Sequence, residues 1–214
     1  MDGLSGPSFF ALYLHHPHLL MTFETRNQII IDGLHPSMRY KLIHLLELLR
    51  PIGEDILFTS GTRTISVHDA LYAKGRTTGG SIVTNAKGGS SFHNYGLAID
   101  FCPVGPLGFA LRGALEWTAY ARYERVAKLA KSIGLESGMD WPQKDRPHLQ
   151  LSECTLAQLK KGQRPDSLKA RYELIAYYQR KIDNARRAMP KAALDRKIDL
   201  QKFITKNQVK ISEL

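Results

Sequence analysis

The run Leu97-Ala98-Ile99-Asp100-Phe101 places a carboxylate inside an otherwise apolar segment. Because side chains alternate between the two faces of a β-strand, the three large apolar residues would face one side, and Ala98 and Asp100 the other. Ala98 is small and leaves room for a bulky group beside the carboxylate. The run therefore predicts a strand with one face on the core and the other face on a polar site.

The segments around this strand predict an α+β fold, in which a small antiparallel sheet has flanking helices. Apolar residues at helical spacing predict a helix over Pro36–Leu49, with a tolerated proline at its start and Pro51 after its end. Two further helices are predicted over residues 66–75 and 109–133, and two further strands over residues 55–59 and 148–152. The 43% apolar content is typical of a folded globular chain.

A histidine precedes the central strand. His93 lies seven residues before Asp100, and an odd separation along a straight strand would place the two on opposite faces. The turn-forming segment Asn94-Tyr95-Gly96 can bring the imidazole back over the carboxylate.

The segment Asp145-Arg146-Pro147-His148 supplies a second histidine. Pro147 argues against a helix, so in an extended segment His148 and Gln150 face the site. Two imidazoles and one carboxylate, with a fourth position for water, are typical of a catalytic zinc ion, Zn²⁺. Asp145 is placed to take a proton from that water. The competing interpretation is a hydrogen-bonded His–Asp pair without metal, and the occurrence of all four residues together favours the metal site.

Five residues of this region form a recognisable motif. Ser91, His93, Gly96, Ala98 and Asp100 fill the pattern S-x-H-x-x-G-x-A-x-D. The pattern resembles the signature of the VanY-like family of D-alanyl-D-alanine carboxypeptidases and L-alanyl-D-glutamate endopeptidases, zinc peptidases that share a fold with the hedgehog signalling domain. The similarity extends over about residues 26–153 and is greatest to the phage endolysin branch. It is supported in order by the segments Gly61–Thr64, Leu71–Thr77 and Gly138–Trp141.

The resemblance implies a role for each matching residue. His93, Asp100 and His148 would bind zinc, and Asp145 would be the general base. Arg63 would bind a substrate carboxylate or stabilise the oxyanion, which suits a permanently charged guanidinium, although a surface salt bridge is the alternative for an isolated arginine. Aspartate rather than glutamate at position 145 favours the endopeptidase branch. Glu136 is a weaker candidate for the base because it lies outside the motif.

Two more residues are candidates for substrate binding. Ser91 binds a ligand or the substrate, or it is a turn hydroxyl. Trp141 lines the substrate groove, or it is a core residue. Cys102 and Cys154 share strand parity with Asp100 and His148, but we interpret both as small buried residues, since a fourth protein ligand would close the site.

The predicted function is that of a zinc-dependent peptidase that hydrolyses the L-Ala–D-Glu bond of peptidoglycan stem peptides, as in endolysin-like, bacteriolytic degradation of the cell wall. A D-Ala-D-Ala carboxypeptidase of the same family is the near alternative. A non-catalytic wall-binding module on the same fold is the alternative of another class, and the complete set of ligands and base counts against it.

The charge changes along the chain. Residues 155–214 hold 15 Lys or Arg against 6 Asp or Glu, whereas residues 1–154 hold 15 against 14. An amphipathic helix is predicted over residues 166–189, and a second, basic helix over residues 191–206 after Pro190. We therefore divide the chain into an N-terminal extension (1–24), a zinc peptidase catalytic domain (25–154) and a basic helical C-terminal region (155–214).

The basic region has three interpretations. It packs on the body as a solvated helical hairpin, it binds an anionic wall polymer or the outer-membrane surface, or it binds nucleic acid. No nucleic-acid fold motif is present, so no specific nucleic acid is expected.

The first residues predict no secretory signal, because an acidic residue, Asp2, precedes the apolar patch Phe9–Leu14 and no small-residue cleavage site follows. No run approaches the roughly 18 apolar residues of a membrane span. We expect synthesis in the cytoplasm and release to the cell wall by a holin-type route.

Overall fold

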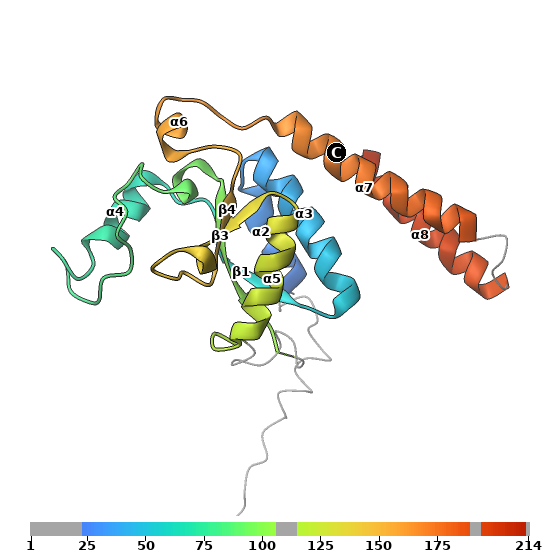
Figure 1. The fold of residues 1–214 in the computed structure, drawn as a ribbon, viewed down its shortest axis with the longest axis horizontal. Helices are drawn as coiled ribbons and strands as arrows, with labels where there is room; N and C mark the ends of the chain where they lie inside the picture. Colours follow the sequence, from blue (N-terminus) through green and yellow to red (C-terminus); the bar gives the residue numbers. More distant parts are fainter. Residues whose placement is uncertain (1–22, 106–114, 189–193, 213–214) are drawn as a thin grey trace, which may run out of the picture.

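The computed structural model describes residues 23–105, 115–188 and 194–212 of the chain. Within these residues, an antiparallel sheet of four strands lies at the centre of the molecule (Figure 1). Its strands, in spatial order, are β1 (Ile56–Ser60), β2 (Ala98–Pro103), β4 (His148–Leu151) and β3 (Leu135–Ser137). The predicted α+β fold with a small antiparallel sheet is thus confirmed.

Three helices cover one face of this sheet: α2 (Phe23–Asp32), α3 (Pro36–Leu49) and α5 (Tyr120–Ser132). Leu97, Ile99 and Phe101 are fully buried in the core between sheet and helices, as the alternation predicts. Burial of each such side chain stabilises the fold by about 1.5–3 kcal/mol. Helix α4 (Ile65–Ala73) and the loop after it lie on the other side of the sheet (Figure 1). That side is left open for polar groups.

Helix α3 has the predicted bounds. The side chain of His35 caps its first turn by accepting a hydrogen bond from the backbone N–H of Ser37 at 3.3 Å, and Pro36 occupies the first position. The chain leaves the helix through the 3-10 helix η1 (Arg50–Ile52) and the left-handed Gly53 (φ 64°).

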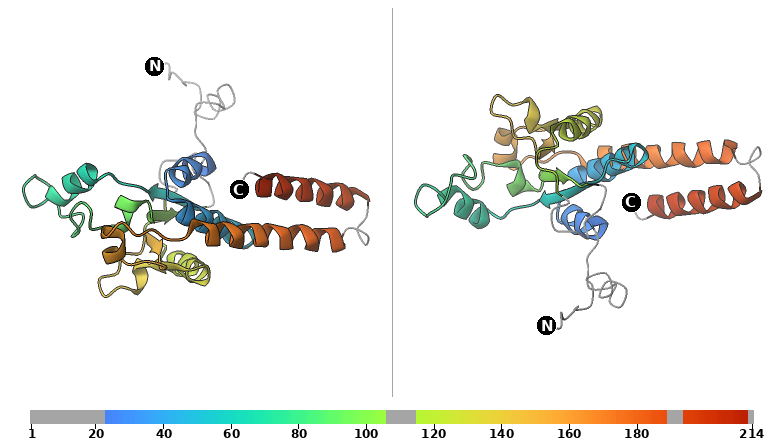
Figure 2. Two further views of the ribbon diagram at one scale, coloured as in Figure 1. Left: turned by 90° about the horizontal axis from the view of Figure 1, so that it is seen from above. Right: turned by 90° about the horizontal axis from the view of Figure 1, so that it is seen from below.

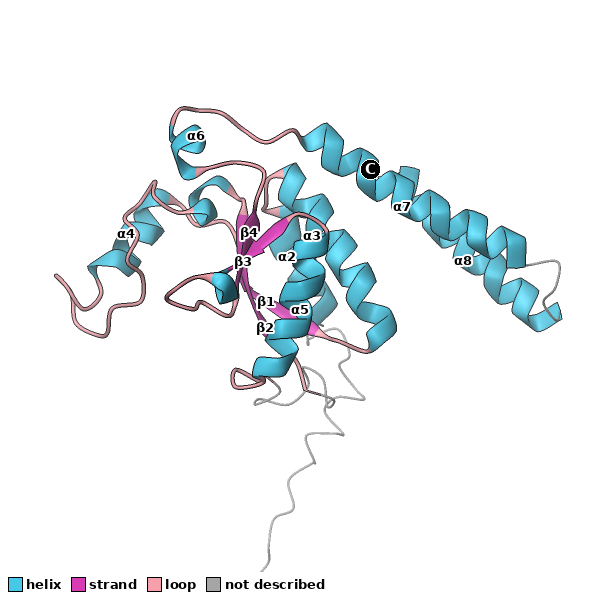
Figure 3. Ribbon diagram, viewed as in Figure 1, coloured by secondary structure: helices cyan, strands magenta, loops and turns pink. Residues whose placement is uncertain are grey.

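Strand β1 begins one residue later than predicted, and β4 and α4 also lie where the sequence predicts them. The helix predicted over residues 109–133 begins only at Tyr120, so the prediction is wrong for residues 115–119 (Figure 3). There Leu115 forms a β-bridge with Val104, and the N–H of Glu116 donates to the carbonyl of Pro103. This hydrogen bonding to the end of β2 outweighs the helical spacing. Residues 109–114 lie outside the described residues.

Three elements were not predicted: α2, β3 and α6 (Leu156–Lys160). Strand β3 and helix α6 are too short for a periodic pattern. Helix α2 is held to β1 by a polar residue, because buried Asn27 donates to Ile56 O at 2.8 Å and accepts from Phe58 N at 2.7 Å. The predicted N-terminal extension (1–24) lies outside the described residues except for its last two positions, which open α2.

Helices α7 (Ser167–Ala188) and α8 (Leu194–Ser212) lie side by side and project from the body (Figure 2). We call them the helical hairpin. Helix α7 was predicted from amphipathic spacing and α8 as a basic helix, although α8 extends beyond the predicted residue 206. Met189, on the predicted apolar stripe of the first helix, lies outside the described residues. Ile182, Ala185 and Ile204 form a small core between the two helices.

The hairpin is attached to α3 through a buried carboxylate. Glu47, only 5% exposed, accepts hydrogen bonds from Lys181 of α7 at 2.9 Å and from Lys210 of α8 at 2.6 Å. None of the helices in the described ranges combines the length and apolar character that crossing a lipid bilayer requires.

Candidate metal centre

The two central strands place Asp100 and His148 opposite each other. In the register of β2 and β4, Asp100 pairs with His148 and Ala98 pairs with Gln150. All four side chains leave the sheet on the face away from the core, as the alternation predicts. The small Ala98 leaves room beside both polar partners.

His93 reaches the same point from the 3-10 helix η2 (Phe92–Tyr95), which precedes β2. Gly96 ends η2 in a left-handed conformation (φ 67°), and a Cβ there would lie 2.9 Å from the backbone nitrogen of His35. Only glycine fits this close turn. The turn therefore folds the imidazole back over β2, as the sequence indicates.

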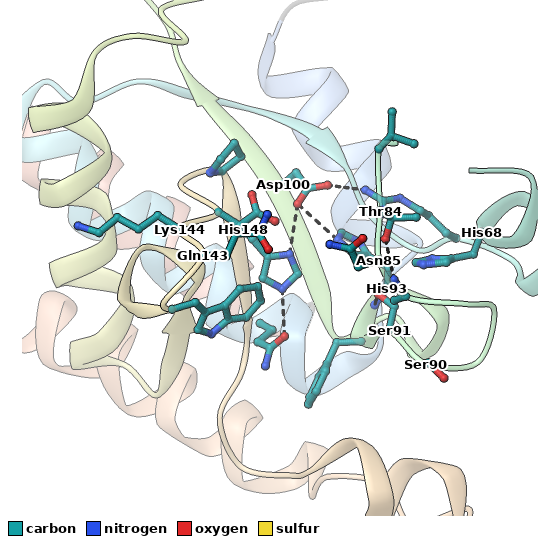
Figure 4. A pocket seen from close by; sticks show the side chains of 18 of the residues that line it. His68, Thr84, Asn85, Ser90, Ser91, His93, Asp100, Gln143, Lys144 and His148 are labelled. Atoms are coloured by element: carbon teal, nitrogen blue, oxygen red, sulfur yellow. Dashed lines mark hydrogen bonds and ion pairs between the residues drawn. The ribbon is translucent and has the colours of Figure 1, made fainter. Parts of the chain in front are cut away.

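The three predicted ligands lie together at the floor of a pocket (Figure 4). Oδ1 of Asp100 lies 3.4 Å from Nε2 of His93 and 3.3 Å from Nδ1 of His148, and one ligand atom from each residue lies within 4.8 Å of the others. These side chains are only 3%, 20% and 8% exposed for His93, Asp100 and His148. Among the described residues, this is the one group of His, Cys, Asp and Glu residues with such spacing.

The other nitrogen of each imidazole has an acceptor of its own. Nδ1 of His93 lies 2.8 Å from the carbonyl oxygen of Gly61, and Nε2 of His148 lies 3.0 Å from Oε1 of Gln150. When each of these nitrogens keeps its proton, Nε2 of His93 and Nδ1 of His148 are the nitrogens that can give up theirs to bind a metal ion beside Asp100. Metal-binding histidines have this arrangement, so the residues present fit a metal ion.

The charges of the three residues are strongly coupled. Burial alone would raise the pKa of Asp100, but hydrogen bonds from His148 and His93 outweigh burial and hold that pKa well below its ordinary value. Burial lowers the pKa of His148, but the hydrogen bond and charge of Asp100 outweigh this and raise it above its ordinary value. Asp100 is thus an anion, as a metal ligand must be.

Arg63 contacts this group from the loop after β1. Its guanidinium donates a short hydrogen bond to Oδ2 of Asp100 and another, of 3.0 Å, to Oγ of Ser60. The backbone of Arg63 is tied to η2, because its N–H donates to His93 O at 3.0 Å and its carbonyl accepts from Asn94 Nδ2 at 3.0 Å. The arginine therefore contacts Oδ2 of Asp100, while both histidines lie next to Oδ1.

Asp145 lines the same cleft from the loop before β4. Burial raises the pKa of its carboxyl, and the negative charge of Asp100 acts in the same direction, while His148 opposes both. The backbone of Asp145 is packed against Gly138, whose carbonyl accepts from Asp145 N at 2.9 Å. A Cβ at position 138 would lie 2.4 Å from the carbonyl oxygen of Asp145, so this approach requires glycine.

The cleft over the site has a volume of about 1160 Å³. The loop after α4 contributes Thr84 and Asn85, and the loop before β4 contributes Trp141 and Lys144 (Figure 4). Trp141 lies with its ring centroid 4.9 Å from that of His148. It is half-buried in the cleft wall and lies outside the central core.

Ser91 also lines the cleft, and its hydroxyl caps η2 by accepting from His93 N at 3.3 Å. The hydroxyl of Ser91 thus helps to position His93. Cys102 and Cys154 do not belong to the metal-binding group found in the described residues; Cys102 is fully buried and Cys154 half-buried.

The sequence analysis did not predict that His68 lines the cleft, nor that Glu136 is hydrogen-bonded to residues next to His148. His68 is buried in α4 and lines the cleft, but no motif singled it out. Glu136 was weighed as a base, whereas in the structure it accepts hydrogen bonds from Trp141 and Gln150. The sequence did indicate one part of this arrangement, because Gln150 lies two residues after His148 and therefore faces the same side of the strand.

Comparison with known proteins gives three findings. The sequence profile of the D-alanyl-D-alanine carboxypeptidase family matches residues 84–151. The peptidoglycan L-alanyl-D-glutamate endopeptidase CwlK of Bacillus subtilis is 38% identical over 156 residues, which cover 66% of this chain and 90% of that protein. The crystal structure of the L-Ala D-Glu endopeptidase ChiX of Serratia marcescens matches with a TM-score of 0.45 and 20% identity, over 63% of this chain and 90% of ChiX.

Proposed function

The chain belongs to the D-alanyl-D-alanine carboxypeptidase and L-alanyl-D-glutamate endopeptidase family of peptidases, and on that premise we propose that it hydrolyses the L-Ala–D-Glu bond of peptidoglycan stem peptides with a bound zinc ion. The bond is suggested by the 38% identity to an enzyme named for it, over 90% of that enzyme. The observation that carries the proposal is the group of His93, Asp100 and His148 at the floor of the cleft.

Zinc suits these donors. Nε2 of His93, Nδ1 of His148 and Oδ1 of Asp100 make a set of two nitrogens and one oxygen, and the cleft gives water and substrate access to a further position. When bound, zinc polarises the scissile carbonyl and lowers the pKa of water from about 15.7 to about 7.

Asp145 is proposed as the general base. It lines the cleft beside the metal group. The pKa of its carboxyl is raised toward neutral pH, which makes it easier for the group both to accept and to donate a proton. It would take the proton of the attacking water and pass it to the leaving amine.

Arg63 is proposed to stabilise negative charge that develops on the substrate, or to bind a substrate carboxylate. Its contact with Asp100 places a fixed positive charge at the metal group. The guanidinium is therefore already in position and does not have to move during the reaction. We propose that Trp141 and Ser91, both on the cleft wall, contact the stem peptide.

The peptide bond is tested by product analysis. Purified peptidoglycan is digested by the zinc-loaded protein, and the new termini are identified by mass spectrometry, with and without a chelator. We expect new N-terminal D-Glu, lost with the chelator and restored by zinc. Release of free D-Ala from intact stems would instead show the carboxypeptidase activity of the same family.

We also propose that residues 155–214 are a separate functional region that binds an anionic surface of the wall or outer membrane. Lys169, Arg171 and Arg180 are exposed on α7, and none of the residues that line the cleft in the described part of the chain comes from the hairpin. Replacing these three by glutamine should weaken salt-sensitive binding to purified walls while leaving hydrolysis of a soluble stem peptide unchanged. DNA binding that is equally salt-sensitive would favour the nucleic-acid interpretation instead.

An endolysin-like role is the proposed setting. Expressed in the cytoplasm of a bacterium with a susceptible wall, the protein should lyse the cells only when a holin is co-expressed. Lysis without the holin would show a different route to the wall.

A further inference from the structure

Glu136 lies one strand beyond the metal site, on β3, where it pairs with Gln150 of β4. Both of its carboxylate oxygens are used. Oε2 accepts a hydrogen bond from Nε2 of Gln150 at 3.1 Å, and Oε1 accepts one from the indole Nε1 of Trp141 at 2.5 Å. Gln150 and Trp141 both also contact His148.

These contacts determine which nitrogen of His148 carries the proton. An ionised carboxylate only accepts hydrogen bonds, so the amide of Gln150 must turn its NH₂ group toward Glu136. Its oxygen then faces Nε2 of His148 at 3.0 Å and requires a donor there. Nε2 therefore keeps its proton, and Nδ1, 3.3 Å from Oδ1 of Asp100, is the nitrogen that can give up its proton to bind a metal ion beside that carboxylate.

Trp141 provides a second contact that depends on the same carboxylate. Its indole packs with a ring centroid 4.9 Å from that of His148, tilted by 43°. The hydrogen bond to Glu136 holds the indole in this place. The orientation of the imidazole and its proton thus both depend on one side chain that does not touch it.

We propose that Glu136 is a positioning residue, which acts through Gln150 and Trp141 to hold His148 with Nδ1 free for the metal. The inference rests on the proposed zinc site but does not depend on which peptide bond is cut. It also gives Glu136 a role other than general base, because both oxygens are occupied and Gln150 lies between Glu136 and His148.

The test is Glu136→Gln, which replaces one carboxylate oxygen by an NH₂ group and leaves the volume nearly unchanged. An amide at position 136 can donate to Gln150, whose own amide can then turn over and present its NH₂ group to His148. That reversal moves the proton of His148 to Nδ1 and removes the lone pair that the metal needs. Loss of such an outer contact weakens metal binding by about 10–100-fold.

Zinc affinity, measured by competition with a chromogenic chelator, follows this change without reference to activity. We expect a loss of zinc affinity of at least tenfold. Asp140→Asn is the matched control, since Asp140 is exposed and pairs with Lys131; its zinc affinity should equal that of the wild type.

Gln150→Leu keeps the test decisive if Glu136→Gln folds poorly. Leucine at position 150 removes the hydrogen bonds to Glu136 and to His148, and it leaves the hydrogen bond between Glu136 and Trp141 in place. We therefore expect a similar loss of zinc affinity. If Glu136 acts through Gln150, the double variant should lose less than the sum of the two single losses. Unchanged zinc affinity in folded Glu136→Gln would overturn the inference. Weaker zinc binding by Glu136→Gln, together with a wild type that does not cut L-Ala–D-Glu, would overturn only the proposed bond.

Discussion

Asp100 and His148 face each other as direct cross-strand partners of β2 and β4, with Oδ1 of the carboxylate 3.3 Å from Nδ1 of the imidazole. Both strands have a hydrogen-bonded neighbour on each side, so the backbone under these two side chains is fixed by the sheet. Sites built on such elements are held more precisely than sites on loops. His93, Arg63 and Asp145 reach this pair from segments that precede or follow a strand.

Asp100→Asn should abolish zinc binding at micromolar concentrations and with it all hydrolysis. Asparagine has the same shape, so the fold should persist, but the amide carries no charge and its NH₂ group repels the guanidinium of Arg63. We expect zinc affinity to fall by at least about 100-fold, measured as zinc retained after dialysis. Stoichiometric zinc in the variant would show that the metal is bound elsewhere.

Asp145→Asn should separate chemistry from metal binding. The side chain is proposed to move a proton and is not a ligand, so kcat should fall by about 10²- to 10⁴-fold while zinc affinity stays within a few-fold of the wild type. Steady-state kinetics on a defined stem peptide and chelator competition give the two numbers. A variant with normal kcat would exclude Asp145 as the base and reopen the search among the cleft residues.

Much of the site could be predicted from local sequence. Strand alternation places Asp100 and His148 away from the core, and the turn at Gly96 explains how His93 joins them. Both features depend on only a few residues that are neighbours in the sequence. The orientation of His148 cannot be predicted in this way, because Glu136 and Gln150 are 14 positions apart and meet only when β3 pairs with β4.

The same limit explains the errors in the fold. Asn27 attaches α2 to β1 through two hydrogen bonds to residues 29 and 31 positions away. The spacing of apolar residues in this segment did not predict the helix. Residues 115–119 have helical spacing, but Leu115 and Glu116 are hydrogen-bonded along the end of β2. In both cases a long-range backbone contact decides the local structure.

Gly138→Ala should impair the enzyme although Gly138 is not among the residues that line the cleft. The added Cβ would lie 2.4 Å from Asp145 O, so the loop that carries the base must move. We expect kcat to fall at least tenfold and the free energy of unfolding to fall by about 1–3 kcal/mol. Gly79→Ala is the control, because no atom lies within 4 Å of a Cβ there. Equal kinetics for the two variants would show that the loop adapts without cost.

Glu47→Gln should loosen the helical hairpin, and the loss should depend on pH. Burial alone would raise the pKa of Glu47, but hydrogen bonds from Lys210 and Lys181 outweigh it and lower the pKa from 4.5 to about 2. A carboxyl with a depressed pKa in the folded state stabilises the fold fully above its unfolded pKa and loses that contribution as the pH falls through the folded one. At pH 7 the substitution should therefore cost about 2 kcal/mol, because two lysines lose a buried partner.

The difference in unfolding free energy between wild type and Glu47→Gln should shrink as the pH falls from about 4.5 to about 2, since the wild-type carboxylate is protonated over that interval. Urea unfolding at pH 7, 4 and 2.5 measures it. Asp183→Asn is the control on α7, because its pair with Arg186 is 4.0 Å long and solvent-exposed; its effect should stay below about 1 kcal/mol at every pH. A difference for Glu47→Gln that stays constant with pH would mean that shape, not charge, holds the hairpin to α3.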